Sequence, residues 1–193
     1  MSFSEIATSH YESARTELIE RIQLRDTVML AYLGAIGTLF GVALATSVSR
    51  DVLLIVPFLT VGAALIVSQH NSVIGSIGSF LVNEYEPFIK TIGQYAPQWD
   101  SSKALHDYSL TSVWFRAAGH FVLIIIPSIA ALVMTYQDSY LTFPTGSFWW
   151  FTIICTISAL VILLHSDRWR KRLYQKYKWQ SMKTTEHESI SQE

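Results

Sequence analysis

Four long apolar runs constrain this chain more than any other feature of its sequence. They cover residues 28–48, 52–68, 113–136 and 147–165. Each is about as long as an α-helix must be to cross a hydrocarbon layer of roughly 30 Å, since a helix rises about 1.5 Å per residue. Half of the residues are hydrophobic and only 15% are charged, a composition typical of membrane proteins. The sequence therefore predicts an all-α membrane protein with four transmembrane helices.

The basic residues indicate how these helices are oriented. Nearly all Lys and Arg lie before the first run, around the stretch between the second and third runs, or after the fourth. The first short link contains only Arg50, and the link between the third and fourth runs contains none. Because cytoplasmic flanks of membrane helices carry the excess of Lys and Arg, we expect both termini and the middle loop to be cytoplasmic.

The first two runs are expected to continue beyond the membrane as amphipathic helices. No Gly or Pro separates the N-terminal segment from the first run, and none interrupts residues 79–86 before Pro87, where we expect the second helix to end. Only three residues, 49–51, join the two runs, so the helices must be antiparallel neighbours. Each extension has an apolar stripe at helical spacing. The first stripe contains Phe3, Ala7, Tyr11, Ala14, Leu18 and Ile22, and the second contains Ile74, Ile77, Leu81, Tyr85 and Phe88.

Burial of these two stripes against each other predicts a helical cytoplasmic body continuous with the membrane part. The expected organisation is a cytoplasmic amphipathic helix at 1–27, transmembrane helices 1 and 2 at 28–68, a cytoplasmic helical extension and loop at 69–112, transmembrane helices 3 and 4 at 113–165, and a basic cytoplasmic tail at 166–193. The single cysteine, Cys155, lies inside an apolar run and is expected to be a buried thiol.

Small residues form a stripe on the first transmembrane helix. Gly34, Gly37 and Gly41 share one face, and Gly37 with Gly41 makes a G-x-x-x-G pattern. Small residues let helix backbones approach closely in lipid. We expect the stripe to pack against the second transmembrane helix, and the alternative is a contact between subunits or a pore lining.

The third transmembrane helix contains the other candidate pore residues. Arg116 and His120 are one turn apart, and ionisable groups in a membrane helix usually face a bundle interior or an aqueous cavity. For Arg116, snorkelling to the inner interface is an equal alternative. Pro127 should kink the helix and free the carbonyl of Leu123, which the Ser128 hydroxyl could satisfy.

The tail interleaves basic and aromatic residues in the sequence "RWRKRLYQKYKW". Contact with anionic lipid headgroups is the simpler interpretation. The alternative is a site for a phosphate-bearing ligand, in which basic groups bind phosphates and rings stack on bases. Its candidate residues are Arg168, Trp169, Arg170, Arg172 and Lys176.

The sequence contains no pattern typical of an enzyme. It has no Gly-rich phosphate loop, no spacing of metal ligands and no nucleophile at a recognisable separation from a base. We therefore expect neither catalysis nor a cofactor. The net charge of −1 also argues against a protein that binds duplex DNA.

Several short motifs resemble those of a family of small prokaryotic membrane proteins. They are "ELIERIQLRD" before the first run, "IGSIG" and "NEYEP" between His70 and Pro87, and Trp99. Some members of this family are similar in size and layout to the membrane channel effector of Hailong-type anti-phage defence systems, and the resemblance covers residues 11–100 in motifs and the rest in layout. The resemblance implies a homo-oligomeric, tetrameric ion channel in the bacterial inner membrane. It also implies control by an oligonucleotide signal from a partner nucleotidyltransferase.

Two functions remain open from the sequence. The first is a gated ion channel whose cytoplasmic helices receive the signal, with conduction between protomers because no single protomer has a charged channel of its own. The second is a non-conducting membrane anchor or sensor whose exposed cytoplasmic stripes dock a soluble partner.

Overall fold

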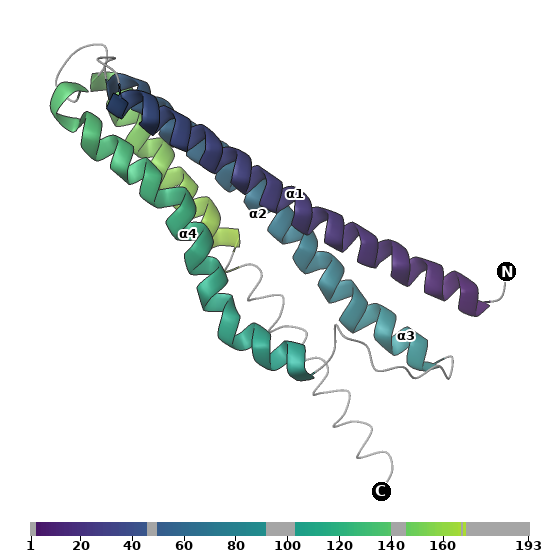
Figure 1. Cartoon of the computed structure of the whole chain (residues 1–193). Coiled ribbons are helices and arrows are strands. Elements are labelled where there is room, and N and C mark those ends of the chain that lie inside the picture. Colours follow the sequence, from purple (N-terminus) through teal and green to yellow (C-terminus); the bar gives the residue numbers. More distant parts are fainter. Residues whose placement is uncertain (1–2, 46–49, 92–102, 140–145, 167, 169–193) are drawn as a thin grey trace, which may run out of the picture.

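The fold is entirely helical wherever the structure, a computed structural model, describes the chain: residues 3–45, 50–91, 103–139, 146–166 and 168. No strand occurs among these residues. Figure 1 shows an elongated molecule in which the N-terminus of α1 and the short helix α3 lie at the same end. The prediction of an all-α protein is therefore confirmed.

The first rod is the single helix α1, Phe3–Ala45. No Gly or Pro interrupts its first 31 residues, so nothing breaks the backbone hydrogen bonding between the amphipathic segment and the apolar run. Its 43 residues make a helix about 65 Å long, roughly twice the thickness of a hydrocarbon layer. About half of α1 therefore extends beyond its apolar run, as the sequence predicted.

The second rod consists of four helical segments without a break. The 3-10 turn η1, Arg50–Ile55, leads into α2, Val56–Phe80, which continues through the π-helical turn η2, Leu81–Tyr85, into α3, Glu86–Thr91. Pro57 lies in the first turn of α2, where a proline leaves no intrahelical hydrogen bond unmade. Figure 1 shows this rod beside α1.

The expectation that Pro87 ends the second rod is wrong, because the helix passes through it to Thr91. A proline in a helix lacks the N–H that would donate four residues back, and its ring crowds that carbonyl. Here the preceding turn is π-helical, with the Glu86 N–H donating five residues back to the carbonyl of Leu81. The wider turn of η2 accommodates the proline ring, so the rod continues.

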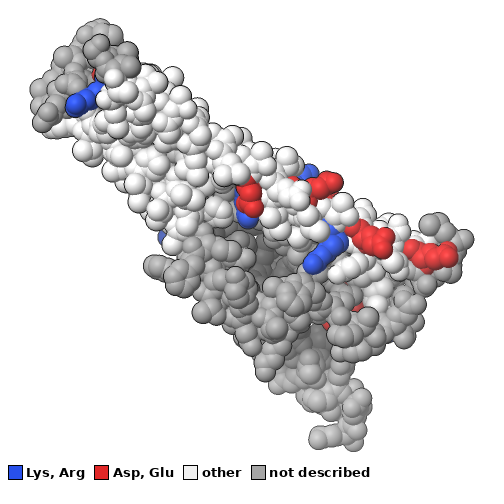
Figure 2. Space-filling view, viewed as in Figure 1, with Lys and Arg blue, Asp and Glu red and all other residues white. Residues whose placement is uncertain are grey.

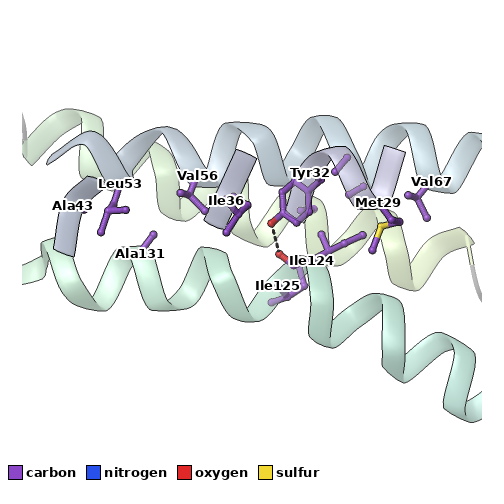
Figure 3. Packing of buried hydrophobic residues seen from close by; sticks show 13 residues of the cluster. Met29, Tyr32, Ile36, Ala43, Leu53, Val56, Val67, Ile124, Ile125 and Ala131 are labelled. Atoms are coloured by element: carbon purple, nitrogen blue, oxygen red, sulfur yellow. Dashed lines mark hydrogen bonds between the residues drawn. The ribbon is translucent and has the colours of Figure 1, made fainter. Parts of the chain in front are cut away.

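The third long helix, α4, runs from Lys103 to Ser139. It begins before residue 113, where the apolar run led us to expect a start, so the last residues of the predicted loop are helical. Pro127 lies inside α4, and Figure 3 shows the helix changing direction beside Ile124 and Ile125. The predicted kink is therefore present. A fourth long helix, Gly146–Ser166, follows.

The hydrophobic core lies where all four long helices meet. Its α1 members recur at helical spacing, and small alanines on the other helices let the backbones approach (Figure 3). The buried core residues are Met29, Tyr32, Ile36, Ala43, Leu53, Val56, Ala63, Ala64, Val67, Ile124, Ile125, Ala131 and Ala159.

Four helices of the described chain are long and apolar enough to cross a membrane: Glu5–Ala45, Arg50–Lys90, Ala118–Tyr136 and Gly146–Ser166. Charged residues are absent from the sequence between Asp26 and Arg50. Figure 2 shows the same separation on the surface, with acidic and basic side chains grouped on the half of α1 near its N-terminus and a wide uncharged zone next to them. The chain thus has the build of a multi-pass membrane protein.

Candidate functional site

A hydrogen bond and a stack of two aromatic rings join the two rods at the end farthest from their apolar runs. The Tyr85 hydroxyl of η2 donates a 2.8 Å hydrogen bond to the backbone carbonyl of Ala7 in α1. The Tyr85 ring stacks on Tyr11, with 5.5 Å between the ring centroids. Leu81 is fully buried one turn before Tyr85. Of the two apolar stripes, Ala7, Leu81 and Tyr85 are buried, whereas Phe88 is 43% exposed. The other described members are half-buried: Tyr11, Ala14, Leu18, Ile22, Ile74 and Ile77.

A polar contact joins the rods where the charged half of α1 ends. The Arg25 guanidinium donates to the Asn71 side chain of α2 at 3.3 Å and to the Asp26 carboxylate at 2.8 and 3.0 Å. Asn71 lies three residues after the second apolar run, and Arg25 lies three residues before the first. This contact lies near the level at which both rods leave their apolar runs.

The rods keep one antiparallel register over their whole paired length. Ala7 contacts Tyr85 near one end, and Tyr32 contacts Thr60 within the apolar part. Ala7 and Tyr32 are as far apart in α1 as Thr60 and Tyr85 are in the second rod. The π-helical turn therefore causes no slip between the two contacts, and the apolar and amphipathic parts of the hairpin are one structural unit.

Hydroxyl groups connect three helices inside the apolar part. The Tyr32 hydroxyl lies 2.9 Å from the Thr60 hydroxyl of α2 and donates to the backbone carbonyl of Ile124 in α4 at 3.0 Å (Figure 3). Thr60 also donates to the carbonyl of Val56 at 2.9 Å. Sequence reasoning missed this cluster. The available signal was a tyrosine in the middle of an apolar run, since a buried hydroxyl in lipid needs a partner.

A second hydroxyl cluster joins α4 to the last helix. The hydroxyls of Ser128 and Thr156 are 2.7 Å apart, and Thr156 donates to the carbonyl of Thr152 at 3.0 Å. The expectation that Ser128 serves the carbonyl freed by Pro127 is not met in the described contacts, because its hydroxyl faces Thr156 on the neighbouring helix. Ser128 is fully buried, so it lies in the bundle interior.

The glycine stripe faces away from the second rod, so its expected packing against the second transmembrane helix is wrong. Gly34, Gly37 and Gly41 are exposed, and a Cβ atom added to any of them would meet nothing within 4 Å. The face of α1 that packs inward instead carries Tyr32 and Ile36. Residues two apart in a helix lie about 200° apart around its axis, which puts Gly34 almost opposite Tyr32 and Ile36, while Gly37 lies about 100° around the axis from Ile36.

The exposed face of α1 in its apolar run has a small-residue stretch at 31–41, flanked by the exposed Leu30, Val42 and Leu44, that the other long helices lack. On α1 the small residues Ala31, Gly34, Gly37, Thr38 and Gly41 are all exposed. The exposed large residues of the other three helices within their apolar parts are apolar and bulky. They are Leu59, Leu65 and Ile66 on α2, Val122, Leu123, Ile126, Ile129 and Val133 on α4, and Phe148, Trp150, Phe151, Ile154, Ile157, Val161 and Leu164 on the last helix.

Most of the other sequence-predicted site residues lie outside the described part of the chain. His120 is half-buried on α4, whereas the side chain of Arg116 lies outside the described residues. Arg168 is exposed, and the remaining tail candidates, Trp169, Arg170, Arg172 and Lys176, lie outside the described residues. The pairings expected for these residues therefore stay predictions.

Within the described ranges, no three His, Cys, Asp or Glu side chains lie close enough to hold a metal ion. Cys155 is buried, as predicted from its place in an apolar run. No protein-family model, curated protein or solved structure matches the chain.

Proposed function

We propose that this chain is the protomer of an oligomeric gated ion channel whose conducting path runs between protomers. The supporting observation is the exposed face of α1, where Gly34, Gly37, Thr38 and Gly41 form a small-residue stretch between the bulky, exposed Leu30 and Val42. In lipid, small residues on an outer face favour close helix association. Around a symmetry axis, such a face also leaves room for ions.

The interior of the protomer offers no competing path in its described part. The buried hydroxyls of Thr60, Ser128, Thr135, Thr152 and Thr156 each have a partner within the bundle. A hydroxyl that donates its proton to a helix carbonyl has no donor left for an anion, and the helices around these groups are packed together in the hydrophobic core. This favours a path outside the single bundle.

Control of the channel is proposed to act through α1. This helix runs without a break from the amphipathic extension, where Ala7 contacts Tyr85, to the glycine-bearing face. A ligand or partner that binds one position of the extension better than another shifts the equilibrium of the whole rod. The extensions and both termini are placed in the cytoplasm by the distribution of Lys and Arg.

The biological role follows from the resemblance alone. It assigns the chain to anti-phage defence in the bacterial inner membrane as a homotetramer. An oligonucleotide made by a partner nucleotidyltransferase would be its signal. The basic and aromatic residues from Arg168 to Lys176 are the candidate contacts for its phosphates and bases.

Reconstitution in planar bilayers tests the channel. We expect single-channel conductance from the unmodified protein and its loss in Gly37→Leu, which fills the proposed contact face. Gly62→Leu is the matched control, since Gly62 on α2 also has nothing within 4 Å of an added Cβ atom. Absence of conductance in the unmodified protein under every ligand condition, or equal behaviour of the two variants, would contradict the proposal.

A non-conducting anchor or sensor is the second candidate function. An open depression on the extension of α1 favours it, and Leu24 at its edge is 51% exposed. The residues lining the depression are Ser13, Thr16, Glu17, Glu20, Arg21 and Leu24. A protein that stays monomeric in detergent, binds a cytosolic partner through this surface and conducts no ions would establish this alternative.

A further inference from the structure

The hydroxyl cluster around Tyr32 contains more hydrogen-bond contacts than protons. Three contacts are within bonding distance: Tyr32 to the Ile124 carbonyl, Tyr32 to the Thr60 hydroxyl, and Thr60 to the Val56 carbonyl. Each hydroxyl supplies one proton, and carbonyl oxygens supply none. Two protons therefore serve three contacts, and one contact is without a proton at any moment.

Three arrangements of the protons each make two hydrogen bonds. In the first, Tyr32 donates to the Ile124 carbonyl and Thr60 donates to Tyr32. In the second, Tyr32 donates to Thr60 and Thr60 donates to the Val56 carbonyl. In the third, Tyr32 donates to the Ile124 carbonyl and Thr60 donates to the Val56 carbonyl, and no proton lies between the two hydroxyls. The number of hydrogen bonds is equal, so an exchange leaves neither hydroxyl without a partner in the apolar interior. The bond between α1 and α4 is present in the first and third arrangements and absent in the second.

The carbonyl that is held or released lies at the bend of α4. Pro127 has no N–H and cannot bond to the carbonyl of Leu123, next to Ile124. Figure 3 shows α4 changing direction at this point. A helix that lacks an internal hydrogen bond bends there more readily than elsewhere. The Tyr32 hydroxyl thus contacts α4 at its most deformable point.

We propose that the Tyr32 and Thr60 hydroxyls form a two-position latch, which holds α4 at its bend in one position and releases it in the other. In the released position Tyr32 donates to Thr60 and the hydroxyl pair joins the two rods, so the expected motion is that of the N-terminal arm of α4 relative to the α1–α2 hairpin. The latch depends on the hydroxyl geometry and not on whether the protein conducts ions.

The second hydroxyl cluster provides an internal comparison. Ser128 and Thr156 also supply two protons, but their described contacts number two: one with each other and one from Thr156 to the Thr152 carbonyl. Every contact in that cluster has its own proton, so it has no competing arrangement. Ser128→Ala is therefore the matched control for a buried hydroxyl that does not switch.

Distance measurements between spin labels test the latch in the full-length protein in lipid nanodiscs. Cysteines placed at Leu30 on α1 and Val122 on α4, both exposed, report the separation of the two helices two residues before the contact. Cys155 is replaced by alanine, and labelled protein is diluted with unlabelled protein so that only distances within one chain are measured. Helix content and chromatographic behaviour identify variants that fail to fold.

The two latch variants are expected to act in opposite directions. Tyr32→Phe removes the bond to Ile124 and should move the distribution toward longer distances and broaden it. Thr60→Val removes the alternative partner, so Tyr32 stays on Ile124 and the distribution should narrow around the short distance. Ser128→Ala should leave it unchanged.

Shifts of Tyr32→Phe and Thr60→Val in the same direction, or no shift in either, would overturn the latch in favour of ordinary packing. If Tyr32→Phe does not fold, Thr60→Val decides alone, because loss of packing broadens the distribution whereas a locked latch narrows it. Adding Pro127→Ala to Tyr32→Phe restores a backbone donor and should return the distribution toward the short distance. No return would contradict the role of the bend.

Discussion

The hydroxyl of Tyr85 and the backbone carbonyl of Ala7 are joined by a 2.8 Å hydrogen bond, although 78 residues separate them in sequence. Both residues are buried, with 7% of Tyr85 and 4% of Ala7 exposed. This buried hydrogen bond is far from the apolar runs, so the extensions form a buried contact of their own outside those runs. The extension is therefore expected to respond to substitution like the core of a soluble protein.

Replacing Tyr85 by phenylalanine should loosen the far end of α1 without unfolding the rod. The ring keeps its stack on Tyr11, but the hydrogen bond to Ala7, worth about 0.5 to 1.5 kcal/mol, is lost. Hydrogen exchange of the amides in residues 3–11 should accelerate by up to about tenfold. Ser9→Ala, at an exposed position, is the control and should leave exchange unchanged. Unaltered protection in Tyr85→Phe would show that the hydroxyl does not hold the helix end.

Truncating Leu81 should destabilise the extension strongly. Leu81 is fully buried, and leucine-to-alanine changes at such sites cost about 2 to 5 kcal/mol. The matched control is Leu24→Ala, the same substitution at a position that is 51% exposed, which should cost much less. Thermal unfolding followed by circular dichroism in detergent compares the two. Similar melting temperatures of the two variants would mean that burial of Leu81 contributes little to the stability of the fold.

The change Gly37→Leu should leave the folded protomer intact. Nothing lies within 4 Å of a Cβ atom at this position, and leucine favours helix over glycine by a few tenths of a kcal/mol to about 1 kcal/mol. The free energy of unfolding of the detergent-solubilised monomer should therefore not fall. A loss of more than about 1 kcal/mol would show that the stripe packs inside the protomer after all.

The pair Ser128 and Thr156 should be energetically coupled. Their hydroxyls are 2.7 Å apart, and hydrogen bonds between membrane helices average about 0.6 kcal/mol, with a maximum near 1.7 kcal/mol. A double-mutant cycle with Ser128→Ala and Thr156→Val, measured by unfolding in mixed micelles, should give a coupling in this range.

The control for this cycle pairs Ser128 with Thr135, whose hydroxyl bonds within its own helix to Ala131. Ser128 and Thr135 are seven residues apart on α4, about 10 Å along the helix, so their substitutions should be additive. Equal coupling in the two cycles would indicate a general loosening of the bundle and not a specific bond between Ser128 and Thr156.

Local sequence signals were sufficient for the architecture. Run lengths predicted the four apolar helices, and the absence of Gly and Pro at the end of the first extension predicted that α1 is continuous. The short link predicted the antiparallel hairpin. The expectation that Pro87 ends the second rod was wrong, because the rule that a proline ends a helix does not take into account the π-helical turn before it. Whether a proline ends a helix or is accommodated depends on the packing of its neighbours, here Leu81 and Tyr85, which no local rule contains.

The candidate site was harder to predict, because a stripe of similar residues identifies one face of a helix but not the helix that packs against that face. On α1, two stripes could have packed against the second rod, one with Gly37 and one with Tyr32, and spacing alone does not choose between them. The same difficulty applies to Ser128, whose partner Thr156 comes from another helix. Contacts between helices that are distant in sequence require the tertiary arrangement.

The shared register of the two rods restricts how this protein can evolve. A single inserted residue in either rod rotates everything beyond it by about 100° around the helix axis. Such a rotation would turn Leu81 or Ala7 away from the contact between the two rods and toward solvent. An insertion in one rod alone would also displace Tyr85 from Ala7 along the hairpin. Homologues with longer or shorter extensions should therefore differ by matched indels in both rods, close to whole helical turns in size.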